Sequence, residues 1–142
     1  MNKCFVDSNI IIRYIIDDIP EQSEIFSLLL DKAEMGDVEL VCNSMVIAEI
    51  VWTLSSFYKF SKEKITEVLQ GIIASKLLSF CERTILLRSL EDFKDLNIDF
   101  IDAYIAAWMN DHDVQDLYTF NKKHFKRLSH VNVLDFSSRA VE

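Results

Sequence analysis

The chain has 142 residues, of which half are apolar, and it contains only two Gly and one Pro. This length and composition fit a single domain over residues 1–142 and exclude two ordinary domains, long linkers and low-complexity tracts. The formal net charge of −8 disfavours a general nucleic-acid binder, because polyanion binding depends on Lys and Arg. One local exception is a basic cluster near the C-terminus, made of Lys122, Lys123, His124, Lys126 and Arg127.

Two features of the sequence bear on where the protein works. The apolar run over residues 10–16 is interrupted by Arg13 and flanked by acids, so it is not expected to span a bilayer, and it lacks the features of a leader peptide. The cysteines Cys4, Cys42 and Cys81 are odd in number and contain no CxxC pair. They are expected to be buried, reduced thiols and not a disulfide framework or a zinc site. These features predict a cytoplasmic protein.

Short apolar strands alternate with amphipathic helices along the chain. The first predicted strand, residues 3–7, ends in a carboxylate and leads directly into a helix that ends near Asp17. Further strands are predicted over residues 38–42, 77–80, 117–120 and 131–134. Helices are predicted to begin at Pro20, at Asn43 or Ser44, at Ser61, at Thr84 and at Asp99, with a short helix over residues 122–128.

This alternation predicts the fold class. Strands that are separated by helices pair in parallel through right-handed crossovers, with helices on both faces of the sheet. The expected architecture is therefore α/β, a three-layer α/β/α sandwich with a central, mostly parallel sheet of about five strands.

Asp7 and Asp102 are the acids that their surroundings single out. Asp7 lies at the carboxyl end of a strand, which is where open α/β sheets bind ligands. Asp102 falls within an apolar arc of its helix at 100° per residue. A buried carboxylate there is costly unless it is paired or binds a metal. The alternative is that Asp102 only complements the helix dipole, three residues after the capping residue Asp99. The members of the arc are Ile101, Ile105, Ala106 and Met109.

Glu49 is a third candidate. It lies about 60° beyond the edge of the apolar arc of its helix, a position that is usually occupied by a solvated residue. Its helix follows the second strand and begins at the same end of the sheet as Asp7. Three carboxylates at one crevice would repel one another without a cation and would suit Mg²⁺ or Mn²⁺. Such a site can hydrolyse a phosphodiester without a covalent nucleophile, and no Ser or Cys has the sequence context of a nucleophile elbow.

Four segments in this order resemble PIN domains. They are Phe5-Val6-Asp7-Ser8-Asn9, the helix that carries Glu49, the run Asp99-Phe100-Ile101-Asp102-Ala103-Tyr104-Ile105-Ala106-Ala107, and the run Leu117-Tyr118-Thr119-Phe120-Asn121-Lys122-Lys123-His124-Phe125. The resemblance covers nearly the whole chain and is strongest to the VapC-like toxin ribonucleases of type II toxin–antitoxin modules.

The resemblance implies an α/β/α fold and an endoribonuclease that depends on Mg²⁺ or Mn²⁺. It also implies a homodimer and a small antitoxin protein as partners, with RNA as the substrate. The family's catalytic and metal-binding acids fall on Asp7, Glu49 and Asp102. Asp99 matches an accessory acid, and Asn121, Ser8 and Thr119 are further candidates in the same motifs.

One position departs from the family pattern. Asn121 stands where many members carry a fourth Asp, and an amide supplies no charge, so a second metal ion is expected to bind weakly. The residues Lys122, Lys123, Lys126 and Arg127 follow directly and are candidates for a substrate or antitoxin contact, or else for a solvated helix face. Asn121 and the acidic net charge leave a second hypothesis open, a PIN-like interaction module with weak or no catalysis. A phosphoacceptor receiver domain ranks lower, because residues 131–135 contain no Lys.

Overall fold

The computed structural model describes residues 2–135; Met1 and residues 136–142, which the predicted single domain includes, lie outside the described part. The chain divides into two compact units, Met1–Leu87 and Arg88–Glu142. The division falls within helix α5 (Arg83–Asp95).

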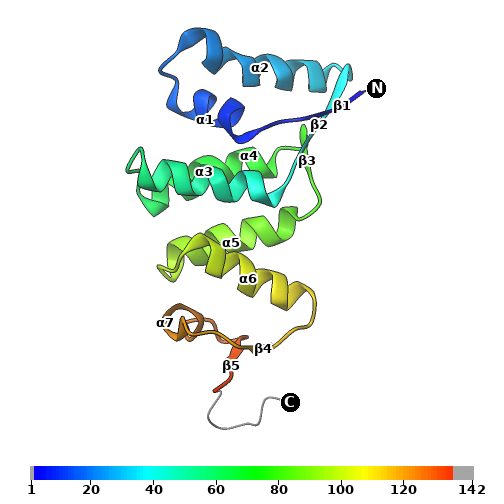
Figure 1. Ribbon diagram of the computed structural model, residues 1–142. Coiled ribbons are helices and arrows are strands. Elements are labelled where there is room, and N and C mark those ends of the chain that lie inside the picture. Colours follow the sequence, from blue (N-terminus) through cyan, green and yellow to red (C-terminus); the bar gives the residue numbers. More distant parts are fainter. Residues whose placement is uncertain (1, 136–142) are drawn as a thin grey trace. The chain divides into compact units, whose positions relative to one another are not determined.

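The first unit contains a three-stranded parallel sheet with helices packed beside it. The strands β1 (Asn2–Phe5), β2 (Val38–Cys42) and β3 (Leu78–Phe80) lie in the order β1-β2-β3, with Cys4 opposite Leu40 and Leu40 opposite Leu78. The helices are α1 (Ser8–Ile16), α2 (Pro20–Glu34), α3 (Ser44–Ser56) and α4 (Lys62–Ala74). Helix α1 packs against α2 and α3, and α3 packs against α4 (Figure 1).

Local chemistry explains where these helices begin. The Asn43 side chain accepts the N–H of Val46 at 3.2 Å and caps α3, and the Ser61 hydroxyl oxygen accepts the N–H of Lys64 at 3.1 Å and caps α4. Side-chain oxygens at these positions satisfy donors that a helix start leaves unpaired. The prediction that Thr84 caps a helix is wrong, because α5 begins at Arg83 and Thr84 lies within its first turn. The predicted start of a helix at Pro20 and the predicted caps at Asn43 and Ser61 are confirmed.

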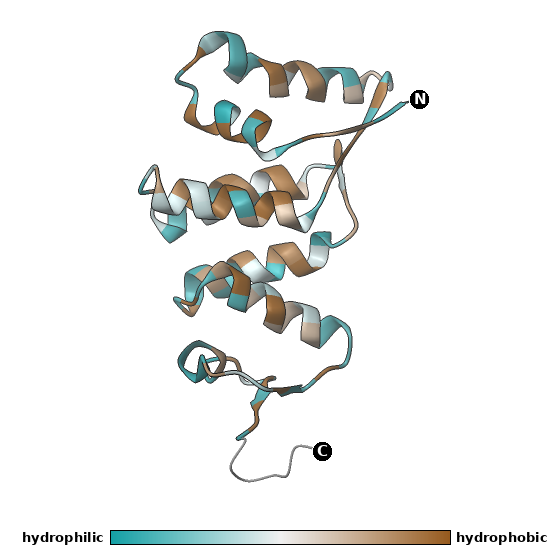
Figure 2. Cartoon of the chain, in the orientation of Figure 1, coloured by the Kyte–Doolittle hydropathy of each residue, from teal (hydrophilic) through white to brown (hydrophobic). Residues whose placement is uncertain are grey.

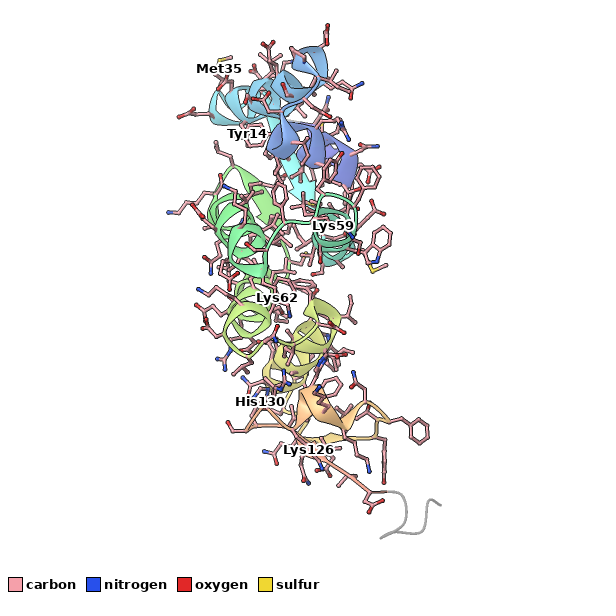
Figure 3. All side chains as sticks on the ribbon, turned by 90° about the vertical axis from the view of Figure 1, so that its left-hand side faces the viewer. Tyr14, Met35, Lys59, Lys62, Lys126 and His130 are labelled. Carbon is pink, nitrogen blue, oxygen red and sulfur yellow. The ribbon has the colours of Figure 1, made fainter. Side chains whose placement is uncertain are left out.

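The core of the first unit follows the apolar periodicity of its helices. Residues three or four positions apart on α3 and α4 are fully buried, together with Leu40 and Leu78 of the sheet. On α3 and α4 these residues are Ile47, Ile50, Leu54, Ile65, Leu69 and Ile73. Figure 2 shows the hydrophobic residues of β2 and of the same helices. Tyr14, labelled in Figure 3, meets Phe26 edge to face at 5.2 Å between ring centroids and so joins α1 to α2.

The second unit is built on α6 (Phe100–Asp111) and the segment that follows it. The strands β4 (Asp116–Leu117) and β5 (Asn132–Val133) pair in parallel, and α7 (Lys122–Phe125) lies between them in sequence and contacts α6. Strand β4 is shorter than the predicted strand over residues 117–120. The Thr119 hydroxyl oxygen accepts the N–H of Asn121 at 3.0 Å, a local turn that ends the extended run before α7.

The structure confirms the α/β class and the parallel pairing of strands that the sequence predicts. Five strands are present in residues 2–135, three in the sheet of the first unit and two in the sheet of the second. This α/β composition agrees with a three-layer α/β/α sandwich, and the single central sheet of about five strands stays a prediction, because the strands of the described residues form two separate sheets.

Candidate functional site

Asp7 is placed directly after the first strand. The N–H of Val6 extends the pairing of β1 by donating to the carbonyl of Val41 at 3.0 Å. Asp7 then caps α1, and its carboxylate accepts the backbone N–H of Ser8 at 2.7 Å. The predicted position at the carboxyl end of a strand is therefore confirmed, and the carboxylate is exposed.

Ser8 connects Asp7 to Glu49. Its side chain is buried, and its hydroxyl donates to Oε1 of Glu49, which projects from α3. Since the backbone N–H of the same residue donates to Asp7, one serine contacts both acids through two different groups. Within the first unit, Asp7, Ser8 and Glu49 thus form one cluster, in which the buried serine donates hydrogen bonds to two exposed carboxylates.

Cys42 lies beside this cluster, and its thiol is expected to react slowly. Its thiol donates to the carbonyl of Val6 at 3.5 Å. Burial, with a smaller effect from the charge on Asp7, raises the pKa of the Cys42 thiol to about 11. The thiol is therefore protonated at neutral pH and is no nucleophile. The expectation that all three cysteines are buried is wrong for Cys81, which is exposed, and Cys4 is half-buried.

Asp102 is the centre of a second cluster, in the second unit. It lies in the first turn of α6 and its side chain is 15% exposed. Its Oδ2 atom accepts Nδ2 of Asn121 at 2.9 Å and Nδ1 of His124, also at 2.9 Å. A carboxylate oxygen only accepts, so His124 carries its proton on Nδ1 in this contact. Asp102 is thus half-buried and paired, as a carboxylate on an apolar helix needs to be.

The buried face of α6 differs in part from the predicted arc. Ala106 and Met109 are buried as expected, but Ile101 is 53% exposed and Ile105 is 36% exposed. On the buried face that the structure shows, Asp102 lies near the boundary and not at the centre. This explains why its carboxylate can meet polar partners from the segment after β4.

Asp99 stands at the N-cap position of α6 but makes no capping hydrogen bond with its side chain. Instead its Oδ2 lies 3.8 Å from Nδ1 of His124, and the side chain is 75% exposed. Asp99, Asp102 and His124 each offer a ligand atom, and these atoms lie within 4.8 Å of one another. The two carboxylates are ligands that suit Mg²⁺ or Mn²⁺, whereas an imidazole is a ligand that transition metal ions accept more readily than Mg²⁺ does.

The basic cluster divides into exposed lysines and one arginine with a structural partner. Lys123 and Lys126 are exposed and Lys122 is half-buried; Lys126 is labelled in Figure 3, and Figure 2 shows α7 as hydrophilic. Arg127 donates from Nη1 to the carbonyls of Leu96 and Asn97, at 3.1 and 2.7 Å. These carbonyls follow the end of α5, where a cation is favourable.

The structure therefore groups the predicted residues into two clusters, one in each unit. Asp7, Ser8 and Glu49 meet in the first, and Asp99, Asp102 and Asn121 meet in the second. His124, which the sequence assigned only to the basic cluster, is the residue whose role sequence reasoning missed. Its position three residues after Asn121 at the start of a helix is the signal that could have indicated a shared partner.

A family model, described as PIN domain, matches residues 4–131. The chain belongs to the PIN domain family. PIN domains are generally nucleases that use divalent metal ions, and the carboxylates of both clusters suit that chemistry. A comparison with curated proteins finds no match. None of the helices in residues 2–135 has both the length and the apolar composition that a membrane span requires.

Proposed function

We propose that this PIN domain is an endoribonuclease that depends on Mg²⁺ or Mn²⁺ and acts in the cytoplasm as the toxin of a toxin–antitoxin module. The proposal is supported by the family match together with the contacts of the three acids. The family model covers residues 4–131, and the three acids expected from the family are all held by polar partners. Asp7 and Glu49 contact Ser8, and Asp102 contacts His124.

In the proposed reaction Asp7, Glu49 and Asp102 are the catalytic and metal-binding residues. When bound, a divalent cation would polarise the phosphodiester, lower the pKa of the attacking water and stabilise the leaving oxygen. The chain's own contribution is to orient the carboxylates. Ser8 fixes two of them through its N–H and hydroxyl, so that they need little reorganisation when substrate and metal bind. A single-domain arrangement over residues 1–142 is part of this proposal.

The α7 region supplies features that suit RNA. Lys123 and Lys126 are exposed on a chain whose net charge is −8. Phe120, one residue before Asn121, is 92% exposed. An exposed aromatic ring beside lysines is the combination that binds single-stranded nucleic acid, with the ring stacking on a base and the lysines meeting phosphates. We assign Lys122, Lys123 and Lys126 to the substrate, and we assign Arg127 mainly to the end of α5.

The partners in the proposal rest on the family resemblance. They are a second copy of the chain, in a homodimer, and a small antitoxin protein. Light scattering on the purified chain measures its molar mass and so tests for the homodimer directly. Growth of a bacterial host that expresses the chain tests the toxin role. Arrest is expected with the unaltered chain and not with the Asp7→Asn variant.

The nuclease proposal is tested by metal removal and return. The full chain is incubated with single-stranded RNA after chelation and again after Mg²⁺ or Mn²⁺ is restored, and the products are resolved by length. Cleavage that stops on chelation and returns with the metal is expected. If Mn²⁺ binds but no RNA is cut, the chain is an interaction module without catalysis, the alternative that Asn121 favours.

A further inference from the structure

One oxygen of Asp102 receives two hydrogen bonds and the other receives none from residues 2–135. Nδ2 of Asn121 and Nδ1 of His124 both lie 2.9 Å from Oδ2. No buried side-chain oxygen in the described part of the chain lacks a partner, so Oδ1 of Asp102 reaches solvent. The two carboxylate oxygens therefore have different environments.

We propose that Asn121 and His124 are positioning residues that hold Oδ2 of Asp102 and leave Oδ1 as the oxygen that meets the cation. The inference rests on the proposed function. It adds that Asn121 and His124 act on the cation only through Asp102. His124 is in this role a hydrogen-bond donor and not itself a ligand.

The physical need for such positioning comes from the carboxylate itself. The terminal torsion of an Asp side chain is broad and roughly two-fold, so an unrestrained carboxylate exchanges its oxygens. Two N–H donors on one oxygen remove that freedom before substrate arrives, and outer partners of this kind orient metal-binding side chains in general. The side chains of His124 and Asp102 are 20% and 15% exposed, which protects the contact from competition by water.

Asn121 gains an explanation from the same geometry. A carboxylate at this position would face Oδ2 of Asp102 with a like charge, whereas the amide presents a donor at hydrogen-bond distance. The neutral residue is therefore not merely a missing ligand. It is a second donor to the carboxylate that His124 also holds, and both come from the segment that starts at the Thr119 turn.

The test is Mn²⁺ and Mg²⁺ binding by the full chain, measured by calorimetry, beside its thermal unfolding. His124→Ala is expected to weaken binding of both ions by about 10–100-fold, as loss of an outer partner does. His124→Asn should restore most of the affinity, because its amide can donate from the place of Nδ1. Asn121→Ala, which removes a hydrogen bond at an exposed position, should weaken binding of both ions and lower the melting temperature only slightly. His112→Ala is the matched control, since this exposed histidine stacks on Trp108.

The outcomes separate this inference from the proposed function. Variants that bind both ions as the unaltered chain does would overturn the positioning role alone. Loss of Mn²⁺ affinity with Mg²⁺ affinity kept would show that His124 is a direct ligand and would also overturn the positioning role, because Mg²⁺ is a hard cation that takes oxygen ligands, whereas a transition metal ion also accepts imidazole. An unaltered chain that neither binds these ions nor cuts RNA would remove the proposed function and the inference with it.

Discussion

The hydroxyl of Ser8 donates to Oε1 of Glu49, a residue 41 positions further along the chain. The backbone N–H of Ser8 donates at the same time to Asp7. Because Ser8 is buried and both acids are exposed, the serine is a fixed point between two carboxylates that would otherwise move independently. Removing its hydroxyl should therefore affect the acids more than the fold.

Ser8→Ala is expected to lower the free energy of unfolding by about 1 kcal/mol, the usual net value of one hydrogen bond. It should also reduce RNA cleavage, since Glu49 loses its orientation. Urea denaturation and the cleavage rate check the two effects. Ser44→Ala is the matched control, because Ser44 makes the same type of bond to Glu82 in the same unit. An equal loss of cleavage in both variants would contradict a specific role for Ser8.

Asn121→Asp should make the chain's stability depend on metal. Without metal, two carboxylates would face each other where an amide now donates at 2.9 Å at an exposed position, at an expected cost of about 0.5–1.5 kcal/mol for the lost hydrogen bond. Adding Mn²⁺ should recover the melting temperature. Asn132→Asp is the control, since Asn132 donates to Asp116 at 3.0 Å. This variant should also be destabilised, but Mn²⁺ should not restore its melting temperature to the same extent. Equal recovery in both would argue against a cation near Asp102.

The cysteines should differ in reactivity. The pKa of the Cys42 thiol is raised from 9.0 to about 11, whereas Cys81 is exposed. At pH 8 a thiol reagent should label Cys81 quickly and Cys42 slowly, as mass spectrometry of the labelled peptides would show. Because the folded pKa is the higher one, the stabilisation from Cys42 is present below about pH 9 and is lost as the pH rises towards 11. The stability difference between the unaltered chain and Cys42→Ala should shrink over that window; a constant difference would contradict the shift.

The lysines of α7 should contribute to RNA binding through charge. The double variant Lys123→Ala and Lys126→Ala is expected to weaken binding of single-stranded RNA and to reduce the slope of log affinity against log salt by about 1–2. Fluorescence anisotropy at several salt concentrations measures both quantities. Lys64→Ala, an exposed lysine of α4, serves as the control. An unchanged slope in the double variant would leave the antitoxin as the partner of these lysines.

The sequence predicts local features well because their causes are local. Strand β2 has the predicted bounds, and the Asn43 and Ser61 caps are recognisable from the residue type that precedes an apolar helix. Asp7 follows from its place after an apolar strand. The predicted cap at Thr84 is wrong because α5 begins at Arg83. The guanidinium of Arg83 donates to the carbonyl of Ile73, and periodicity does not report such a contact.

The contacts of the acids could not be predicted in the same way. The His124 contact depends on the turn at Thr119, which shortens β4 and carries Asn121 and His124 to Asp102. A helical wheel treats α6 alone, so it placed Ile101 in the apolar arc although that residue is 53% exposed. The Ser8 and Glu49 contact likewise joins residues that periodicity considers separately. In each case the missing information is which element packs beside which.

The most direct test compares the rate of Mn²⁺-dependent RNA cleavage in Asp7→Asn and Asp102→Asn, one variant from each unit, with that of the unaltered chain. Each substitution removes a charge from a proposed ligand, and a bound metal stabilises the transition state by several kcal/mol, so each rate should fall at least about 100-fold. Asp17→Asn is the control, because this exposed residue has φ +56°, which Asn tolerates. A variant of Asp7 or Asp102 that cleaves RNA as fast as the unaltered chain would contradict the proposed function.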